Sequence, residues 1–290
     1  MGLEDVLKFA WETMWHHPKT LLLGVINWIP AVFALSYIAF LLSELTLLDL
    51  GSIYSVGGMI ALIWKLAPLI AGYTVLSWAA SAFSAAAYAS LTQQFAHHKK
   101  PSVSDAFYTG KRLVLPMMWL QFLTGLVVAL PIIVALAVSL LVIGGAGAAT
   151  AGSGSITALI AGMGLFASLL IVAFAVTFYL SIKTWLAPVA LVVENRRGFD
   201  AVKRSFELTK GKFWHILLVL IVMGVVNNVV FQIAASVFQV MVLGSLTAAL
   251  AVYFSFVLLV MLPFGMWAMT APAALYFEYG LGKTPTKVRK

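Results

Sequence analysis

The chain has 290 residues, of which 62% are hydrophobic and only 10% are charged. Its mean hydropathy is +1.02. Soluble domains carry about 25% charged residues to face water, so this composition excludes a water-soluble globular domain and predicts that lipid surrounds most of the chain. The sequence contains no cysteine, which excludes disulfides, thiol catalysis and thiolate metal sites.

The first residues predict a helix at the membrane surface, followed by a transmembrane helix. Residues 3–15 place apolar side chains on one helical face and charged side chains on the other, with Trp11 and Trp15 on the apolar side. This pattern is typical of an interfacial amphipathic helix. The apolar run from Thr20 to Leu42 is too long for the core of a signal peptide, and it lacks a small-residue cleavage site, so we expect it to be retained.

The middle of the chain predicts two further spans with a short amphipathic piece between them. The second span covers about Leu66 to Phe95, and the third covers about Leu113 to Ile143. Ser102 has the side chain and the position of an N-cap for the amphipathic piece. Residues 144–155, GGAGAATAGSGS, predict a flexible loop. A phosphate-binding loop would need a preceding strand and a following lysine, which this segment lacks.

The last third predicts a fourth span, a third amphipathic helix and two more spans. Their expected limits are Ile156 to Val193, residues 198–210, Phe213 to Leu243, and Leu246 to Phe277. In the amphipathic helix we expect Phe199, Val202 and Phe206 to face inward. The pairs Asp200/Arg204 and Lys203/Glu207 have the i,i+4 spacing of outward-facing ion pairs.

Several of these spans exceed the roughly 20 residues that cross a bilayer, so they must tilt, kink or protrude. Prolines offer places for kinks. They are Pro116, Pro131, Pro188, Pro263 and Pro272.

The basic residues predict the orientation in the membrane. The chain carries 18 lysines and arginines and a net charge of +8. All but Lys65 and Lys183 lie near the N-terminus, in the segments 99–112 and 196–212, or in the tail 283–290. Six spans with both termini in the cytoplasm place these charges inside, as in proteins of the cell (inner) membrane. Because orientation accounts for the positive charge, we do not expect nucleic acid as a partner.

The spacing of elements predicts an internal repeat within a single membrane domain, 1–290. Asp5, Asp105 and Asp200 each open an amphipathic segment that precedes a span. The pattern AP-x-AL recurs at Ala187–Leu191 and Ala271–Leu275, and each copy is followed by a glutamate. In the first unit Tyr88 to Gln94 stands in its place. We therefore expect an all-α bundle of six spans in three repeats, 1–100, 101–195 and 196–282.

One segment also resembles a known family. It has an E-x-x-x-G-x-x-A-hydrophobic-x-R-S pattern that precedes K-G-x-F-W. The residues are Glu194, Gly198, Ala201, Val202, Arg204 and Ser205, followed by Lys210, Gly211, Phe213 and Trp214. Over about thirty residues this string is similar to the membrane domain beside some glycerophosphodiester phosphodiesterases and to related prokaryotic families of unknown function. The resemblance implies about six spans and no established activity. Nothing in the sequence supplies the soluble barrel that carries phosphodiesterase chemistry.

Two groups of polar residues within the spans are candidates for a ligand site or a pathway. Lys183 lies within the fourth span, where it either extends its ammonium to the membrane surface or binds an anionic headgroup or substrate. The fifth span carries a polar stripe on one face, which either joins helices or lines a pore or lipid groove. Its candidate residues are Asn228, Gln232 and Gln239, together with Gly224 and Ser236.

The third candidate is a collar of basic residues that would face anionic headgroups on the cytoplasmic side. Its members are Arg196, Arg197, Lys203, Arg204, Lys210 and Lys212. The histidine pairs 16/17 and 97/98, with His215, could in principle meet and bind a metal, but adjacent histidines on a helix point about 100° apart and chelate poorly. We therefore expect no metal and no cofactor.

These observations predict a non-enzymatic membrane protein that interacts with lipids or acts as a scaffold. None of the ten acidic residues falls inside a predicted span, whereas ion-coupled transporters and hydrolases need acids at their centre. A channel or uncoupled transporter with its pathway between the three hairpins is the alternative. Membrane lipids are the expected partners, and a protein partner or a second copy of the chain is left open.

Overall fold

The computed structural model describes residue 8 and residues 18–44, 55–96, 101–150, 156–242 and 262–281. Within these ranges every regular element is a helix and no strand occurs, which confirms the prediction of an all-α protein for this part of the chain. Four of the helices are long and apolar enough to span a membrane. The predicted interfacial helix 3–15 lies outside these ranges except for Lys8, as do the basic tail 283–290 and both histidine pairs.

The first hairpin consists of helices on either side of residues 45–54. Its elements are the 3₁₀ helix η1 (Pro18–Trp28) and the helices α2 (Ile29–Glu44) and α4 (Val56–Ala96). α4 begins well before the predicted start at Leu66 because Ser55 caps it: the Ser55 hydroxyl accepts a hydrogen bond from the Gly58 amide at 3.0 Å. The hydroxyl of Tyr37 donates to the carbonyl of Lys65 at 3.0 Å and joins α2 to α4.

The second hairpin consists of α5 (Val103–Thr150) and α6 (Ile156–Thr184), which contact each other. Ser102 caps α5 as predicted, since its hydroxyl accepts from the Asp105 amide at 3.2 Å. α5 then continues without interruption, so the expected boundary before Leu113 is absent and residues 144–150 are helical rather than a loop. The alanines of this segment favour a helix, and Pro116 and Pro131 are both accommodated inside α5.

The rest of the chain forms two short helices followed by two longer ones. They are α7 (Ala187–Val193), α8 (Phe199–Leu208), α9 (Phe213–Val242) and α11 (Leu262–Leu281). The predicted fourth span is divided, because a turn at Trp185 and Leu186 separates α6 from α7, immediately before Pro188. The limits expected for the third amphipathic helix and the fifth span agree with α8 and α9. Residues 243–261, which include the first part of the predicted sixth span, lie outside the described ranges.

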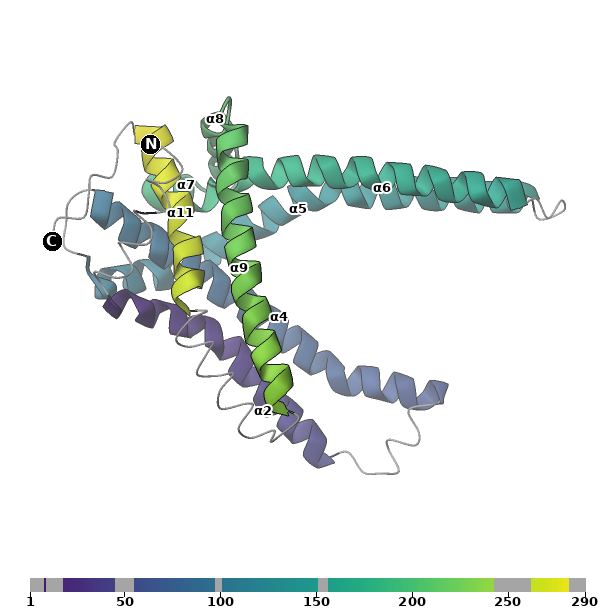
Figure 1. Ribbon diagram of the computed structural model, residues 1–290, viewed down its shortest axis with the longest axis horizontal. Helices are drawn as coiled ribbons and strands as arrows, with labels where there is room; N and C mark the ends of the chain where they lie inside the picture. Colours follow the sequence, from purple (N-terminus) through teal and green to yellow (C-terminus); the bar gives the residue numbers. More distant parts are fainter. Residues whose placement is uncertain are drawn as a thin grey trace.

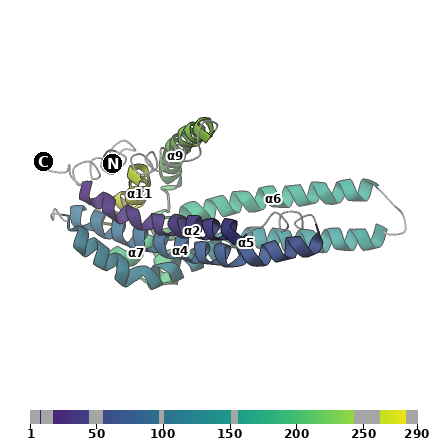
Figure 2. The ribbon, with the colours of Figure 1, turned by 90° about the horizontal axis from the view of Figure 1, so that it is seen from below.

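The helices diverge from one compact region, which we call the base. The base consists of α7, α8, residues 80–92 of α4 and residues 267–277 of α11, where most of the buried residues lie. α4 contacts both α7 and α11, and α7 contacts α8 and α11. Figure 1 shows the α5–α6 hairpin and α4 leaving this region in different directions. In Figure 2, α9 and α11 lie to one side of the layer that contains α2, α4 and α5.

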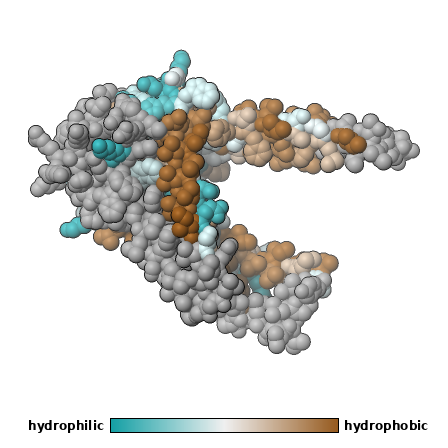
Figure 3. Space-filling view, in the orientation of Figure 1, coloured by the Kyte–Doolittle hydropathy of each residue, from teal (hydrophilic) through white to brown (hydrophobic). Residues whose placement is uncertain are grey.

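The hydrophobic core lies at the base, whereas the long helices expose apolar side chains. The core includes Leu120, Leu186, Leu191, Ile216 and Leu275, all at most 1% exposed. In contrast, the apolar windows of the four candidate spans are only 0–17% buried inside the chain. Figure 3 shows hydrophobic surface along α9 and the α5–α6 hairpin. Because a water-soluble protein does not expose so much contiguous apolar surface, the fold has the properties of a membrane protein.

Three segments of the base share one pattern of burial. They run from Ala87 to Gln94 in α4, from Ala187 to Glu194 at α7, and from Ala271 to Glu278 in α11. Each begins with a fully buried alanine and has a buried leucine four residues later. The alanine and the leucine project from one face because residues four apart are neighbours on a helix. The faces of the α7 and α11 segments pack in one hydrophobic cluster, whereas Ala87 and Leu91 of α4 pack in a neighbouring cluster with Leu23, Phe83 and Ala106.

The close crossing of α5 over α4 predicts an effect of substituting Gly110. A Cβ atom there would lie 2.8 Å from the Phe83 ring, whereas a Cβ at Gly125 in the same helix would meet nothing within 4 Å. We expect Gly110→Ala to destabilise the protein by about 1–3 kcal/mol through overpacking, and Gly125→Ala to be neutral or stabilising by up to about 1 kcal/mol. Thermal unfolding of both variants in detergent tests this. Equal midpoints for the two variants would contradict it.

Candidate functional site

The break between α6 and α7 is held together by one side chain of α8. Pro188 has no amide hydrogen, so the helix cannot continue normally across this point. The hydroxyl of Ser205 donates to the carbonyl of Lys183 at 2.6 Å and accepts from the amide of Leu186 at 3.2 Å. Ser205 is completely buried. It thus satisfies two backbone groups at the break and fixes α8 across it.

The chain reaches α8 through a turn that requires glycine. Gly198 precedes α8 with φ 57° and ψ −130°, a conformation that residues with a Cβ avoid. Ala201, completely buried, and Val202 then face the core. These contacts explain why glycine, alanine and an apolar residue occur at their positions in the E-x-x-x-G-x-x-A-hydrophobic-x-R-S pattern.

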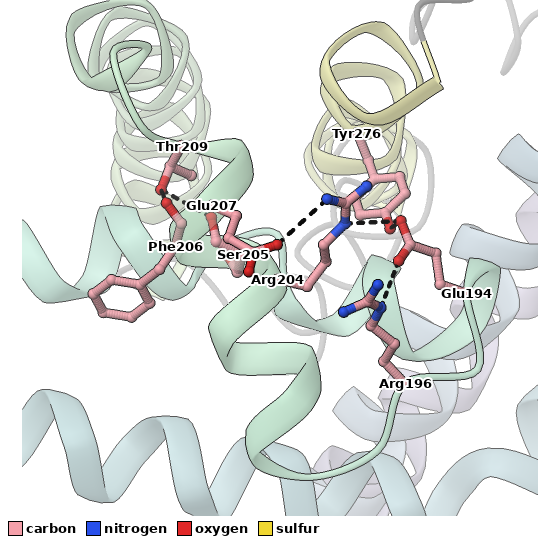
Figure 4. A network of polar contacts seen from close by, with 8 residues as sticks. All are labelled: Glu194, Arg196, Arg204, Ser205, Phe206, Glu207, Thr209 and Tyr276. Carbon is pink, nitrogen blue, oxygen red and sulfur yellow. Dashed lines mark hydrogen bonds and ion pairs between the residues drawn. The ribbon is translucent and has the colours of Figure 1, made fainter.

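The first and last charged residues of this pattern form an ion pair that joins three elements. Arg204 Nε of α8 lies 3.0 Å from Glu194 Oε1 at the end of α7, and Arg196 Nε lies 2.7 Å from Glu194 Oε2. Tyr276 of α11 donates its hydroxyl to the same Glu194 Oε1. Figure 4 shows Arg204, Arg196 and Tyr276 converging on this carboxylate. We call Glu194, Arg196, Arg204 and Tyr276 the clasp.

The clasp keeps Glu194 ionised. Partial burial raises the pKa of the carboxyl, but the hydrogen bonds from Tyr276 and Arg204 and the charges of Arg204 and Arg196 outweigh burial. The pKa of Glu194 therefore lies below its ordinary value of 4.5. The side chains of Glu194 and Arg204 are 18% and 23% exposed, so their contact is a partly buried connection between α7, α8 and α11, with the more exposed Arg196 at its outer side.

Lys183 has a partner that neither sequence interpretation named. Its side chain is buried, and its ammonium donates to the carbonyl of Thr209 at 3.1 Å. The same ammonium lies 5.5 Å from the centre of the Tyr179 ring. Thr209 is the C-cap of α8, where a positive charge interacts favourably with the helix dipole. In this structure Lys183 therefore holds the end of α8 against α6.

Most of the predicted collar lies at the surface of the base. The exposed members are Arg196, Arg197, Lys203, Lys210 and Lys212. Arg204 and Arg196 both contact Glu194 in the clasp, but Arg204 is the less exposed of the two, and its second partner is Glu207 at 3.4 Å rather than the predicted Asp200. Phe199 was expected to face inward, but it is 64% exposed, because it is the first residue of α8 and lies outside the buried face formed by Ala201, Val202 and Ser205. Exposed apolar and basic side chains thus occur together on α8.

The polar stripe of α9 lies partly within the described residues. Gly224, Asn228, Gln232 and Ser236 are exposed. The hydroxyl of Ser236 donates to the carbonyl of Gln232 at 2.8 Å, within the helix. The side chain of Gln239 falls outside what the structure describes. Lys183 lies at the end of α6 and contacts the end of α8, and it has no contact with the stripe on α9 among the interactions of the described residues.

Sequence reasoning missed the aromatic contacts made by α11. Tyr276 belongs to the clasp, and the Tyr279 hydroxyl lies 2.8 Å from His215 Nδ1 at the start of α9. The ammonium of Lys212 lies 4.6 Å from the centre of the Tyr279 ring, a cation–π contact. The repeated AP-x-AL pattern indicated that this segment matters, but it gave no sign of which tyrosine would reach Glu194. These contacts connect α11 to the loop before α9.

In chemical terms the base combines a neutralised interior with a cationic exterior. Within the clasp, the charge of Glu194 is balanced by arginine. The exposed lysines and arginines on α8 and its flanking loops have donors available for phosphate oxygens. This arrangement is suited to binding anionic groups at the surface.

Comparison with known proteins gives a family but no activity. A family model described as a domain of unknown function, DUF8558, matches residues 72–277. No curated protein matches the chain, and no solved structure matches it. The matched residues include the clasp, Ser205, Lys183 and all of α9. The resemblance to the membrane domain beside glycerophosphodiester phosphodiesterases stays a prediction.

The clasp predicts unequal effects for two glutamates that contact Arg204. Glu194→Gln removes a charge-assisted contact between partly buried groups, and we expect it to destabilise the protein by about 2 kcal/mol. Glu207→Gln is the matched control, since Glu207 is 49% exposed and an exposed pair contributes less than about 1 kcal/mol. Thermal unfolding in detergent measures both. A Glu207 variant as unstable as the Glu194 variant would show that the clasp has no special role.

The low pKa of Glu194 also predicts a dependence of stability on pH. Because the folded-state pKa lies below 4.5, the carboxylate contributes its full stabilisation above that value and loses it as the pH falls through the folded-state pKa. The melting temperature of the wild type should therefore drop between pH 6 and about pH 3 by more than that of Glu194→Gln. Parallel profiles for the two proteins would contradict this.

Proposed function

The chain belongs to the DUF8558 family of unknown function, and we propose that it is a non-enzymatic integral protein of the cell membrane that binds anionic lipids and organises them or partner proteins. The base lies at the cytoplasmic surface, where its exposed cations contact headgroups. The long helices extend from the base into the bilayer. Lipid tails cover their apolar sides.

The main support for this proposal is that exposed basic side chains and exposed apolar side chains lie on different parts of the molecule. The exposed cations of α8 and its flanking loops lie at one end of the molecule, and the apolar windows of the candidate spans are at most 17% buried. In Figure 3 hydrophilic surface gathers around α8, whereas α9 and the α5–α6 hairpin are hydrophobic. Exposed Phe199 and Trp214 accompany the cations, and aromatic side chains prefer the membrane–water interface.

The proposal includes six spans with both termini in the cytoplasm. The four candidate spans belong to α4, α5, α6–α7 and α9, and the apolar helices at η1–α2 and α11 would provide the other two. The positive charge of the loops near residues 99–112 and 196–212 then lies inside, as the orientation of membrane proteins requires.

Three repeats of an amphipathic helix and a hairpin form the second part of the architecture we propose. Gly110 contacts Phe83, and Ser205 contacts Lys183. Phe83 lies four residues before Ala87, and Lys183 lies four residues before Ala187. Each of these alanines begins one of the buried segments described above. The polar residues that end these segments also behave alike: Gln94 accepts from the Ser102 amide at 2.6 Å, and Glu194 accepts from Arg204. The first turns of α5 and the helix α8 thus pack on the helices that precede them in the same register, which supports a duplicated unit.

A channel or uncoupled transporter is the alternative. Its candidate residues are Asn228, Gln232 and Gln239, and its pathway would run between the hairpins. The exposed amides of Asn228 and Gln232 favour a channel because such side chains can form hydrogen bonds with water in a pathway. The contacts of the base favour lipid binding more directly, because they display cations at the surface.

Lipid selectivity tests the proposed function. We expect native mass spectrometry to retain phosphatidylglycerol on the protein in preference to phosphatidylcholine. Lys203→Gln should lower the affinity for phosphatidylglycerol roughly fivefold, since a cation near the membrane surface contributes about 1 kcal/mol. Lys65→Gln is the matched control, because Lys65 is also exposed but lies on α4 away from the collar. Equal retention of both lipids, or equal effects of the two variants, would overturn the proposal.

A further inference from the structure

The polar stripe of α9 lies opposite the face with which α9 packs on its own chain. Val219 and Met223 are buried in the core at the base. With about 100° per residue in a helix, Asn228 lies about 180° around the helix from Val219 and about 140° from Met223. In Figure 3 a hydrophilic patch interrupts the apolar surface partway along α9. The stripe therefore faces away from the core that anchors this helix.

The amides on this face have no partner among the described residues. Asn228 and Gln232 are both exposed, and neither side chain donates or accepts a hydrogen bond within the described part of the chain. Both lie inside the candidate span Phe213–Ile233. Lipid tails cannot form hydrogen bonds, so amides at this depth gain from a partner that can.

We propose that this face of α9 is a self-association surface, which binds the same face of a second copy of the chain. The inference rests on the proposed placement of α9 across the membrane. Copies inserted in the same orientation carry their stripes at the same depth, so Asn228 of one copy meets Asn228 of the other. An amide is both donor and acceptor, which makes two identical stripes complementary.

The spacing of the stripe also fits a close helix pair. Gly224, Asn228 and Gln232 follow one another at four-residue intervals, which form a single ridge along the helix. A Cβ at Gly224 would meet nothing within 4 Å, so this position is open toward the outside. Glycine there lets a second backbone approach closely, as in other associating transmembrane helices.

Disulfide cross-linking tests the proposal in the chain as it exists, because the sequence contains no cysteine. Ile221 and Ile233 are a matched pair, 52% and 50% exposed. Ile221 lies about 20° from Asn228 around the helix, and Ile233 lies about 140° away. In oxidised membranes we expect Ile221→Cys to give a covalent dimer on denaturing gels and Ile233→Cys to stay mostly monomeric.

A second variant separates the role of the amides from simple proximity. In the Ile221→Cys chain, Asn228→Leu together with Gln232→Leu should reduce the dimer at least fivefold while the protein stays in the membrane. Resistance to alkaline extraction measures membrane insertion independently of the cross-link. An Ile221→Cys chain that alkali extracts would refute the proposed membrane placement rather than self-association. No dimer from an inserted Ile221→Cys chain, equal dimer from Ile233→Cys, or dimer that persists without the amides would each overturn self-association. In those cases lipid, water or another segment of the same chain covers the stripe.

Discussion

The hydrogen bonds of the Ser205 hydroxyl are the interaction on which the base depends. A transmembrane helix normally satisfies its own backbone groups, and a break in it exposes some of them. Here the break falls between α6 and α7, and Ser205 supplies both a donor and an acceptor to it. Because Ser205 belongs to α8, the repair also fixes the amphipathic helix at one position. The clasp then holds the middle of the same helix through Arg204, and the contact between Lys183 and Thr209 holds its C-terminal end.

This arrangement explains why a short charged helix can organise a mainly apolar protein. α8 contacts α5, α6, α7 and α11, so it touches helices from different hairpins. The buried face of α8 carries the small polar side chain of Ser205 and the apolar side chain of Val202. Its outer face carries exposed cations. The inner contacts are therefore satisfied without solvent, while the outer side chains remain available to phosphate groups. One helix thereby joins the packing of several long helices to an exposed cationic surface.

The sequence predicted the helical class, the limits of α8 and α9, the cap at Ser102 and the exposure of most collar residues, because these features follow from local periodicity and charge. It did not predict that α5 would be continuous or that α6 would end at Thr184. Proline alone does not decide between a kink and a break: Pro116 and Pro131 remain inside a helix, whereas Pro188 follows a turn that distant Ser205 stabilises. Glu194 and its partner Tyr276 are 82 residues apart in the sequence, and Lys183 and its partner Thr209 are 26 residues apart. No local sequence pattern encodes such tertiary contacts.

The length of α5 has a mechanical consequence for the bilayer. At about 1.5 Å per residue, its 48 residues extend roughly 72 Å, more than twice the thickness of a typical hydrocarbon layer of about 30 Å. Figure 1 shows that the hairpins also point in different directions, so no single plane lets all of them stand upright. The surrounding lipids must thicken, tilt or thin to cover the exposed apolar side chains, and the membrane stores part of that strain.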